Sequence, residues 1–182
     1  MDLAAAVLER APGPGGCRLV AVDGFSGSGK SALAGELGRA LDAPVISVEE
    51  LYPGWSGLTA SIPLALEWIG APLFRGEPAR WWPWDWPREE RSPHPRTQAV
   101  VPVVVLEGCG SGAAALRPVI STLIWADCPP GERERRLRAR PDWPGYAPHR
   151  AAFAHDEAAH FAVDRTAEHA DLVVDTLRTP PP

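Results

Sequence analysis

Short apolar runs alternate with amphipathic segments along most of the chain. The apolar runs are rich in β-branched residues and have the length of buried strands. They lie at residues 19–23, 44–48, 102–108, 120–127 and 172–174. Apolar residues at helical spacing occur in segments between or beside these runs. Such helices are predicted at residues 2–10, 31–41 and 61–70, and two further helices are predicted at the arginine-dense segment 132–140 and at residues 149–168. Residues 179–182 are expected to be a frayed tail.

The order of these elements predicts the class of fold. Strands that alternate with helices form parallel sheets whose two faces are covered by the helices. We therefore expect a three-layer α/β fold, with a parallel five-stranded sheet and helices on both faces. A chain of 182 residues, 45% of them hydrophobic, is long enough to bury a substantial core. Residues 1–182 are expected to form a single domain.

Residues 72–98 interrupt the alternation. This stretch is rich in Trp and Pro, and it contains Trp81, Trp82, Trp84 and Trp86. Because proline disfavours a helix interior and a central strand, an irregular loop is predicted here. Two interpretations remain open, and both can hold. The loop is a hydrophobic flap that packs on the domain, or it forms a wall on the substrate side of a binding site.

The clearest chemical signal is the segment 24–31, Gly-Phe-Ser-Gly-Ser-Gly-Lys-Ser. It matches the phosphate-binding (Walker A) pattern G-x-x-x-x-G-K-[ST], and a predicted strand precedes it and a helix follows it, as this motif requires. The glycines let backbone N–H groups point inward, and the helix directs its positive end at the anion. The predicted ATP-binding residues are Gly24, Ser26, Gly27, Ser28, Gly29, Lys30, Ser31 and Ala32.

Lys30 is the only lysine in the chain, where the other long basic side chains are all arginine. A lysine kept at this one position indicates that arginine would not serve there. We expect Lys30 to reach the β- and γ-phosphates, and the Ser31 hydroxyl to bind Mg²⁺.

Acidic residues stand at the carboxyl ends of two predicted strands. Glu49 and Glu50 follow the second strand, and Glu107 directly follows the apolar residues of the third. Ligands bind at this end of the strands in open α/β sheets. Glu49 is therefore a candidate for the base that accepts a proton from an acceptor hydroxyl, or for the group that holds that hydroxyl. Glu107 is a candidate carboxylate for Mg²⁺.

Residues 130–148 are predicted to form a lid. Arg133, Arg136 and Arg140 recur at a spacing that places them on one helical face. They are expected to stabilise negative charge on a transferring phosphoryl group, although a solvated surface helix is the alternative. Glu157 and His160, an i, i+3 pair on the next helix, are interpreted as an ordinary hydrogen-bonded or surface pair.

These residues together resemble the uridine kinase-like branch of the P-loop nucleoside kinases, in particular its short actinobacterial-type members, over roughly residues 18–175. The segment 22–31 is similar to the opening motif of that family, and Leu106-Glu107-Gly108 to its strand-end Glu-Gly. The arginines at 133, 136 and 140 match its lid arginines in spacing.

Two further segments carry the resemblance to the substrate side. Glu49-Glu50-Leu51-Tyr52 stands where the family has Asp-x-Phe-Tyr, with a catalytic aspartate. The resemblance therefore implies a catalytic role for Glu49 and a substrate contact for Tyr52. Trp84-Asp85-Trp86 resembles a Tyr-Asp-Phe segment beside the nucleoside, which implies substrate contacts for Trp84 and Asp85. Pro141 replaces the aspartate that usually follows the last lid arginine.

The sequence thus predicts an ATP- and Mg²⁺-dependent kinase that transfers the γ-phosphoryl group to a hydroxyl of a small molecule, for which a nucleoside such as uridine is one candidate. The expected catalytic residues are Lys30, Glu49, Arg133, Arg136 and Arg140. The alternative is a nucleotide-binding switch or a partner-binding module with little or no phosphotransfer, with the Trp-rich loop as its interaction surface.

Composition bears on location and partners. The net charge of −5 gives no indication of nucleic-acid binding. No apolar run approaches the ~20 residues of a membrane span. The three cysteines lack the spacing of metal ligands and fit a cytoplasmic protein with incidental thiols. The sequence leaves a homo-oligomer open.

Overall fold

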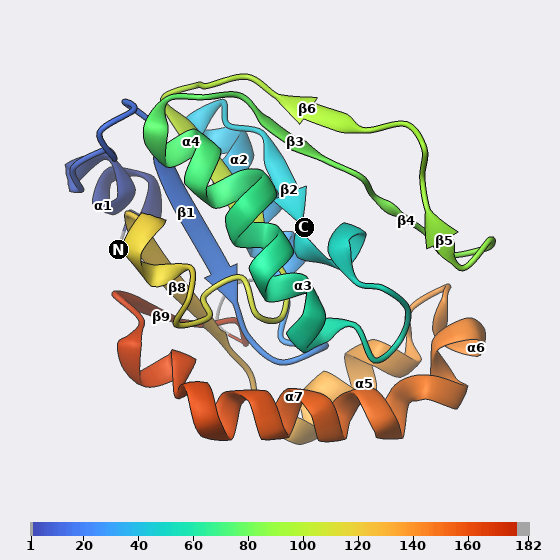
Figure 1. The fold of residues 1–182 in the computed structure, drawn as a ribbon. Helices are drawn as coiled ribbons and strands as arrows, with labels where there is room; N and C mark the ends of the chain where they lie inside the picture. Colours follow the sequence, from blue (N-terminus) through green and yellow to red (C-terminus); the bar gives the residue numbers. More distant parts are fainter. Residues whose placement is uncertain (1, 178–182) are drawn as a thin grey trace.

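The central sheet has five parallel strands in the order β2–β7–β1–β8–β9 (Figure 1). The structure is a computed structural model that describes residues 2–177. The predicted parallel five-stranded sheet is confirmed, and the predicted tail at 179–182 lies outside the described residues. The strands are β1 Arg18–Asp23, β2 Val45–Ser47, β7 Val103–Glu107, β8 Thr122–Asp127 and β9 Leu172–Asp175.

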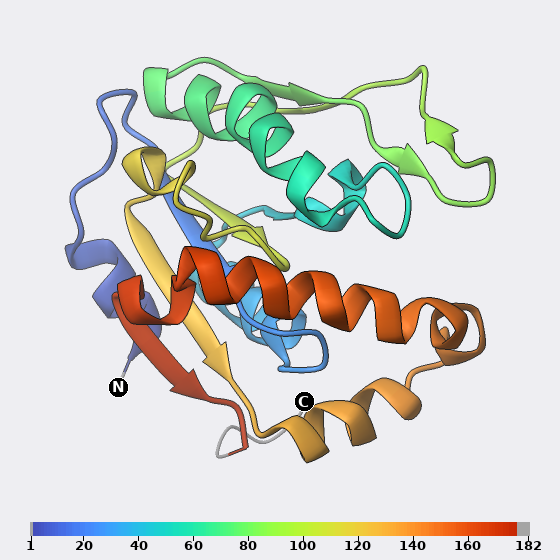
Figure 2. The ribbon, with the colours of Figure 1, turned by 60° about the horizontal axis from the view of Figure 1, so that its bottom comes forward.

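Two apolar cores lie on opposite faces of this sheet because successive strand residues point to opposite sides. Val20 and Val22 of β1 pack with Leu33 and Leu37 of helix α2 (Lys30–Leu41). Helix α1 (Leu3–Glu9) adds to that core. Leu19 belongs to the other core, which is covered by α3 (Leu58–Ala65), α4 (Ala71–Arg75) and α7 (Arg150–Asp164). The three layers place the carboxyl ends of the strands and the start of α2 at one edge of the molecule (Figure 2).

The predicted helix at 61–70 is longer than the periodicity indicated. Helix α3 (Leu58–Ala65), a π-helical turn (Leu66–Gly70) and helix α4 (Ala71–Arg75) follow one another without a break. Pro72 stands in the first turn of α4, directly after the π-helical turn, and the helix continues through it. The expectation that residues 72–98 contain no helix is therefore wrong for 72–75.

The Trp-rich stretch is more regular than the predicted loop. Strand β3 (Ala79–Trp81) pairs antiparallel with β6 (Arg96–Gln98), and β4 (Trp84–Asp85) pairs antiparallel with β5 (Glu90–Arg91). These strands form a long hairpin, the Trp hairpin (residues 79–98), outside the central sheet (Figure 1). Prolines occupy its turns and the gaps between its short strands, which is how the stretch accommodates them.

The lid region contains helix α5 (Pro130–Arg138), helix α6 (Trp143–Tyr146) and a 3-10 turn (Ala147–His149). They lead into α7 (Arg150–Asp164), which ends earlier than the predicted 149–168 because Arg165 adopts a left-handed conformation. A 3-10 turn (Thr166–His169) follows. Among residues 2–177, no helix combines the length and the apolar character that a membrane crossing requires.

Candidate active site

The predicted phosphate loop joins the end of β1 to the start of α2. The buried carboxylate of Asp23 fixes its entry by accepting the N–H groups of Gly24 at 2.7 Å, Gly110 at 3.1 Å and Gly112 at 2.8 Å. Burial raises the pKa of Asp23 to about 7, although these hydrogen bonds and Lys30 act in the opposite direction. Asp23 thus supports the loop from behind, outside the cavity on the loop's other side.

A cavity of about 330 Å³ opens in front of the loop. Its lining residues are Ser26, Gly27, Gly29, Lys30, Ser31, Ala32, Glu49, Arg136 and Arg140. Gly27 has a φ of 79°, and a Cβ there would stand 2.5 Å from the Arg133 carbonyl oxygen, so both its conformation and its contact with α5 require glycine. Six of the eight predicted ATP-binding residues line this cavity.

The other two, Gly24 and Ser28, do not line it. The Gly24 carbonyl accepts the Cys109 thiol at 3.2 Å. The Ser28 carbonyl accepts the Thr176 hydroxyl at 2.6 Å, which ties the back of the loop to the segment after β9. In this structure these two residues hold the loop in place.

Lys30 is 5% exposed at the floor of the cavity. Its ammonium donates to the Phe25 carbonyl at 3.3 Å. Burial lowers the pKa of Lys30, but the surrounding acidic groups outweigh burial and leave the pKa raised. Those groups are Cys109, Glu49, Glu157 and Glu107. Lys30 therefore stays charged at neutral pH and can meet an anion.

Ser31 and Glu107 come together as the sequence predicted. The Ser31 hydroxyl donates to Glu107 Oε2 at 2.9 Å, beside the cavity. Both are hard oxygen ligands, the type that Mg²⁺ takes. Within residues 2–177 no group of three or more His, Cys, Asp or Glu could hold a metal. Two protein ligands, Ser31 and Glu107, fit Mg²⁺, which usually binds through one or two protein groups together with waters and phosphate oxygens.

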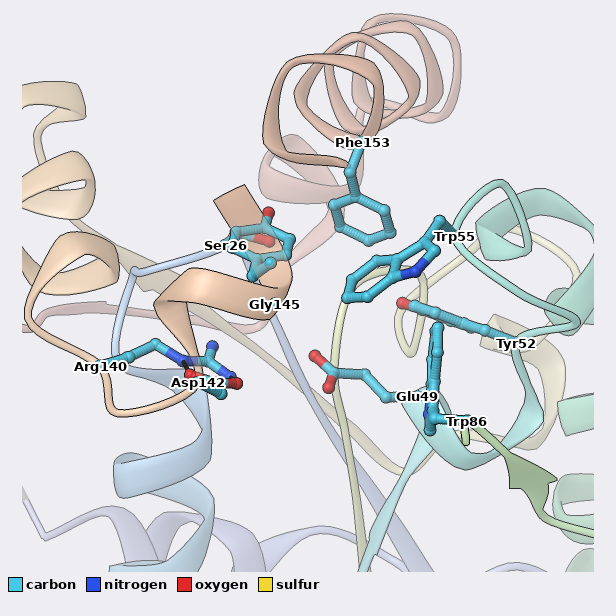
Figure 3. Close-up of a pocket in the computed structure, with 10 residues that line it drawn as sticks. Ser26, Glu49, Tyr52, Trp55, Trp86, Arg140, Asp142, Gly145 and Phe153 are labelled. Atoms are coloured by element: carbon cyan, nitrogen blue, oxygen red, sulfur yellow. Dashed lines mark hydrogen bonds and ion pairs between the residues drawn. The ribbon is translucent and has the colours of Figure 1, made fainter. Parts of the chain in front are cut away.

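A second cavity, of about 300 Å³, adjoins the first (Figure 3). Its lining residues are Ser26, Glu49, Tyr52, Trp55, Trp86, Arg140, Asp142, Gly145, Tyr146 and Phe153. Three residues therefore border both cavities: Ser26, Glu49 and Arg140. Aromatic rings form most of its walls, and Glu49, Arg140 and Asp142 supply its charged groups.

Glu49 lies on the 3-10 turn Val48–Leu51 that follows β2. Its carboxylate points into the space between the aromatic wall and the Arg140–Asp142 pair (Figure 3). The side chain is open to solvent within the cleft, but the surrounding protein partly desolvates it and raises its pKa. Lys30 acts against that shift. A carboxylate of raised pKa between two cavities is suited to accept a proton.

The predicted lid arginines occupy different places. Arg136 lines the first cavity and donates to Thr176 Oγ1 at 3.1 Å and to Glu132 at 2.8 Å. Arg140 borders both cavities and makes a bidentate pair with Asp142 at 2.8 and 2.6 Å. Arg133 lies over the Phe25 ring, 4.4 Å from its centroid, and does not line either cavity.

The predicted substrate contacts are likewise divided. Tyr52 lines the second cavity and donates its hydroxyl to the Cys109 carbonyl at 2.7 Å. Trp86 lines it too, whereas Trp84 and Asp85, two residues before it, do not. Trp84 lies under the Arg91 guanidinium, 5.5 Å from the ring centroid. In the Trp hairpin, Trp81 is buried in the domain core, as the flap interpretation expects. Trp86 forms a wall of the second cavity, and the assignment of that wall to a substrate stays a prediction.

Sequence patterns missed several residues of the second cavity. Trp55 and Phe153 come from segments about a hundred residues apart, and no local pattern connects them. The only sequence signal for Asp142 was that it is an acid two residues after the lid arginine Arg140. Its carboxylate pairs with Arg140, a role that the side chain of Pro141 cannot fill. Tyr146 had none beyond its place in the predicted lid.

Solved structures share this fold. A possible uridine kinase from Bacillus stearothermophilus is 17% identical, with a TM-score of 0.69 and 95% of each chain covered. A provisionally assigned fructose transport system kinase from Silicibacter sp. TM1040 is 23% identical, with a TM-score of 0.53, over 96% of this chain and 100% of that one. A shikimate kinase from Acinetobacter baumannii in complex with shikimate is 13% identical, with a TM-score of 0.51, over 87% and 83%.

These likenesses define the fold, which is the three-layer P-loop fold that the sequence predicted. The sequence itself matches no protein-family model and no curated protein.

Proposed function

We propose that the protein is an ATP- and Mg²⁺-dependent kinase that phosphorylates a hydroxyl of a small, uncharged molecule with a flat ring, such as a nucleoside. The observation that carries the proposal is that Glu49 and Arg140 border both cavities. A phosphoryl donor in the first cavity and an acceptor in the second would meet at these two residues. The kinase fold of the structural neighbours supports this division.

The first cavity supplies the groups that a triphosphate requires. The backbone of the phosphate loop and the start of α2 favour anionic oxygens, and the Lys30 ammonium adds a fixed positive charge. Ser31 and Glu107 would hold Mg²⁺, which when bound neutralises charge on the β- and γ-phosphates. Arg136 and Arg140 add positive charge from the lid side.

Where the two cavities meet, Glu49 would accept the proton of the acceptor hydroxyl while the oxygen of that hydroxyl bonds to the γ-phosphorus. The bond from that phosphorus to the bridging oxygen breaks, and ADP leaves with the electron pair. Arg140 is placed to stabilise the charge on the transferring group, and Asp142 orients its guanidinium. The raised pKa of Glu49 makes it a better proton acceptor than an ordinary carboxylate.

The second cavity favours an uncharged acceptor. Among the described residues that line it, Arg140 is the one cationic side chain, and the proposed transfer already assigns that charge to the phosphoryl group. An anionic acceptor would therefore face Glu49 without a free positive partner. The rings of Trp55, Trp86 and Phe153 offer apolar surface for a flat molecule. A cytoplasmic location fits the three cysteines, which are free thiols.

The test is ADP release from Mg-ATP with a panel of nucleosides, neutral sugars and small hydroxy acids. We expect stimulation by an uncharged ring compound and none by its carboxylate analogues. Glu49→Ala should lower turnover by about 10²-fold or more while ATP still binds. Lys30→Ala should abolish stimulation.

Tight ATP binding without turnover by any compound would instead favour the nucleotide-binding switch or partner-binding module. In that case Glu49→Ala would leave the behaviour of the protein unchanged.

A further inference from the structure

A buried carboxylate lies behind the phosphate loop, outside the groups that the proposed transfer uses. Glu157 is 1% exposed. Its Oε1 accepts the backbone N–H of Ser26 at 2.6 Å and the thiol of Cys109 at 3.0 Å. Burying a carboxylate is costly unless its hydrogen bonds compensate. An acid at this position is therefore a specific feature of the site.

Helix α7 carries Glu157 on the face that supports the loop. Phe153, Glu157 and Phe161 recur every four residues, so they share that face. Phe153 lines the second cavity, and the Phe161 ring lies 4.7 Å from that of Phe25 in the loop. Glu157 thus interrupts an apolar stripe, at the point where the stripe meets the loop backbone.

The same carboxylate is connected to the lid helix. Arg150, at the start of α7, has its Nη1 3.7 Å from Glu157 Oε2. Its Nε donates to Glu134 of α5 at 3.3 Å. The polar series Ser26–Glu157–Arg150–Glu134 therefore links the phosphate loop to the helix that carries the lid arginines.

We infer that Glu157 is a positioning residue for the phosphate loop, which it holds through the Ser26 N–H in the conformation that receives ATP. Ser26 borders both cavities, and Gly27 follows it in a left-handed conformation. A fixed amide at 26 sets the direction of the backbone just before that turn. This inference rests on the proposed function, because it assigns Glu157 to the binding of the phosphoryl donor.

The test compares two conservative variants for Mg-ATP binding by calorimetry. Glu157→Asp keeps the charge but is one methylene shorter, so it should lose the 2.6 Å hydrogen bond. Glu157→Gln keeps an oxygen acceptor at full length. We expect the aspartate variant to raise the Kd for Mg-ATP about tenfold and the glutamine variant to stay within about threefold of wild type. Asp156→Asn, on the same helix, should leave the Kd unchanged.

Kinetics separate positioning from a general loss of structure. In Glu157→Asp, the KM for ATP should rise in parallel with the Kd, while kcat at saturating ATP changes by less than about threefold. Thermal unfolding reports whether each variant folds. If the aspartate variant does not fold, Glu157→Gln decides alone: a Kd near wild type supports the inference, and a tenfold loss overturns it.

Wild-type affinity in Glu157→Asp would overturn the inference and leave the kinase proposal standing. Equal losses in both variants would overturn it as well, because the full-length oxygen acceptor that Glu157→Gln keeps would then fail to preserve the affinity. A wild-type protein that binds Mg-ATP no better than Lys30→Ala would overturn the proposed function, and this inference with it.

Discussion

Glu49 and Glu50 are adjacent in the sequence, but their carboxylates lie in different environments. Glu49 borders both cavities, whereas Glu50 accepts the indole N–H of Trp81 at 2.8 Å and the Arg96 guanidinium at 2.6 Å. The 3-10 turn Val48–Leu51 separates the two directions. One acid is thus available for chemistry, and the other fastens the Trp hairpin, which carries Trp86 into the second cavity.

Glu50→Ala should lower the free energy of unfolding by about 1–3 kcal/mol, because the buried Trp81 indole would lose its acceptor. The Arg96 pair is largely exposed and should contribute little of this loss. Urea denaturation measures the effect. Glu90→Ala, at an exposed site of the same hairpin, is the control, and equal stability of the two variants would contradict the assignment.

The value of kcat/KM should fall as the solution becomes acidic, and the midpoint of this acid limb should lie above pH 4.5, the ordinary pKa of a glutamate. Glu49 must be deprotonated to accept a proton, and its pKa is raised by desolvation, so activity is present above that raised pKa and is lost as the pH falls through it. Lys30 and Arg140 oppose this shift, while Glu107 and Asp142 reinforce it. Glu49→Gln should remove the limb, and a limb that persists in this variant belongs to another group.

Lys30→Arg should lower kcat/KM by about 10²-fold or more, because a planar guanidinium cannot replace a compact ammonium at a nearly closed site. Steady-state kinetics with varied ATP give the value. Arg39→Lys, on the exposed side of α2, is the reverse exchange and should have no effect. If the kcat/KM of Lys30→Arg stayed within a few-fold of the wild-type value, the site would not require a lysine at position 30.

Arg140→Met should lower kcat by about 10²-fold at saturating substrates, through the loss of a positive group at the junction of the cavities. Arg138 is the matched control: its side chain is 66% exposed and pairs with Glu134 away from both cavities. Arg138→Met should keep a kcat near that of wild type. A similar loss in both variants would indicate a general effect on the lid.

The sequence by itself determined the parallel sheet, the phosphate loop and the residues beside it. These features depend on local patterns: apolar runs of strand length, glycines at fixed offsets, and an acid directly after a strand. Ser31 follows the phosphate loop at the carboxyl end of β1, and Glu107 ends β7. Because parallel strands bring their carboxyl ends to one edge, the sequence could assign both residues to one Mg²⁺ site, and the structure places them in a hydrogen bond.

Only the tertiary structure decided the composition of the second cavity and the roles of the neighbouring acids. Trp55, Trp86 and Phe153 meet there from three separate segments, and packing over long sequence separations brings them together. In the sequence, Glu157 and His160 have the spacing of an ordinary hydrogen-bonded or surface pair. Glu157 is a buried partner of the loop because α7 turns that face inward. Helical periodicity shows which residues share a face, but the position of the helix in the fold determines what that face contacts.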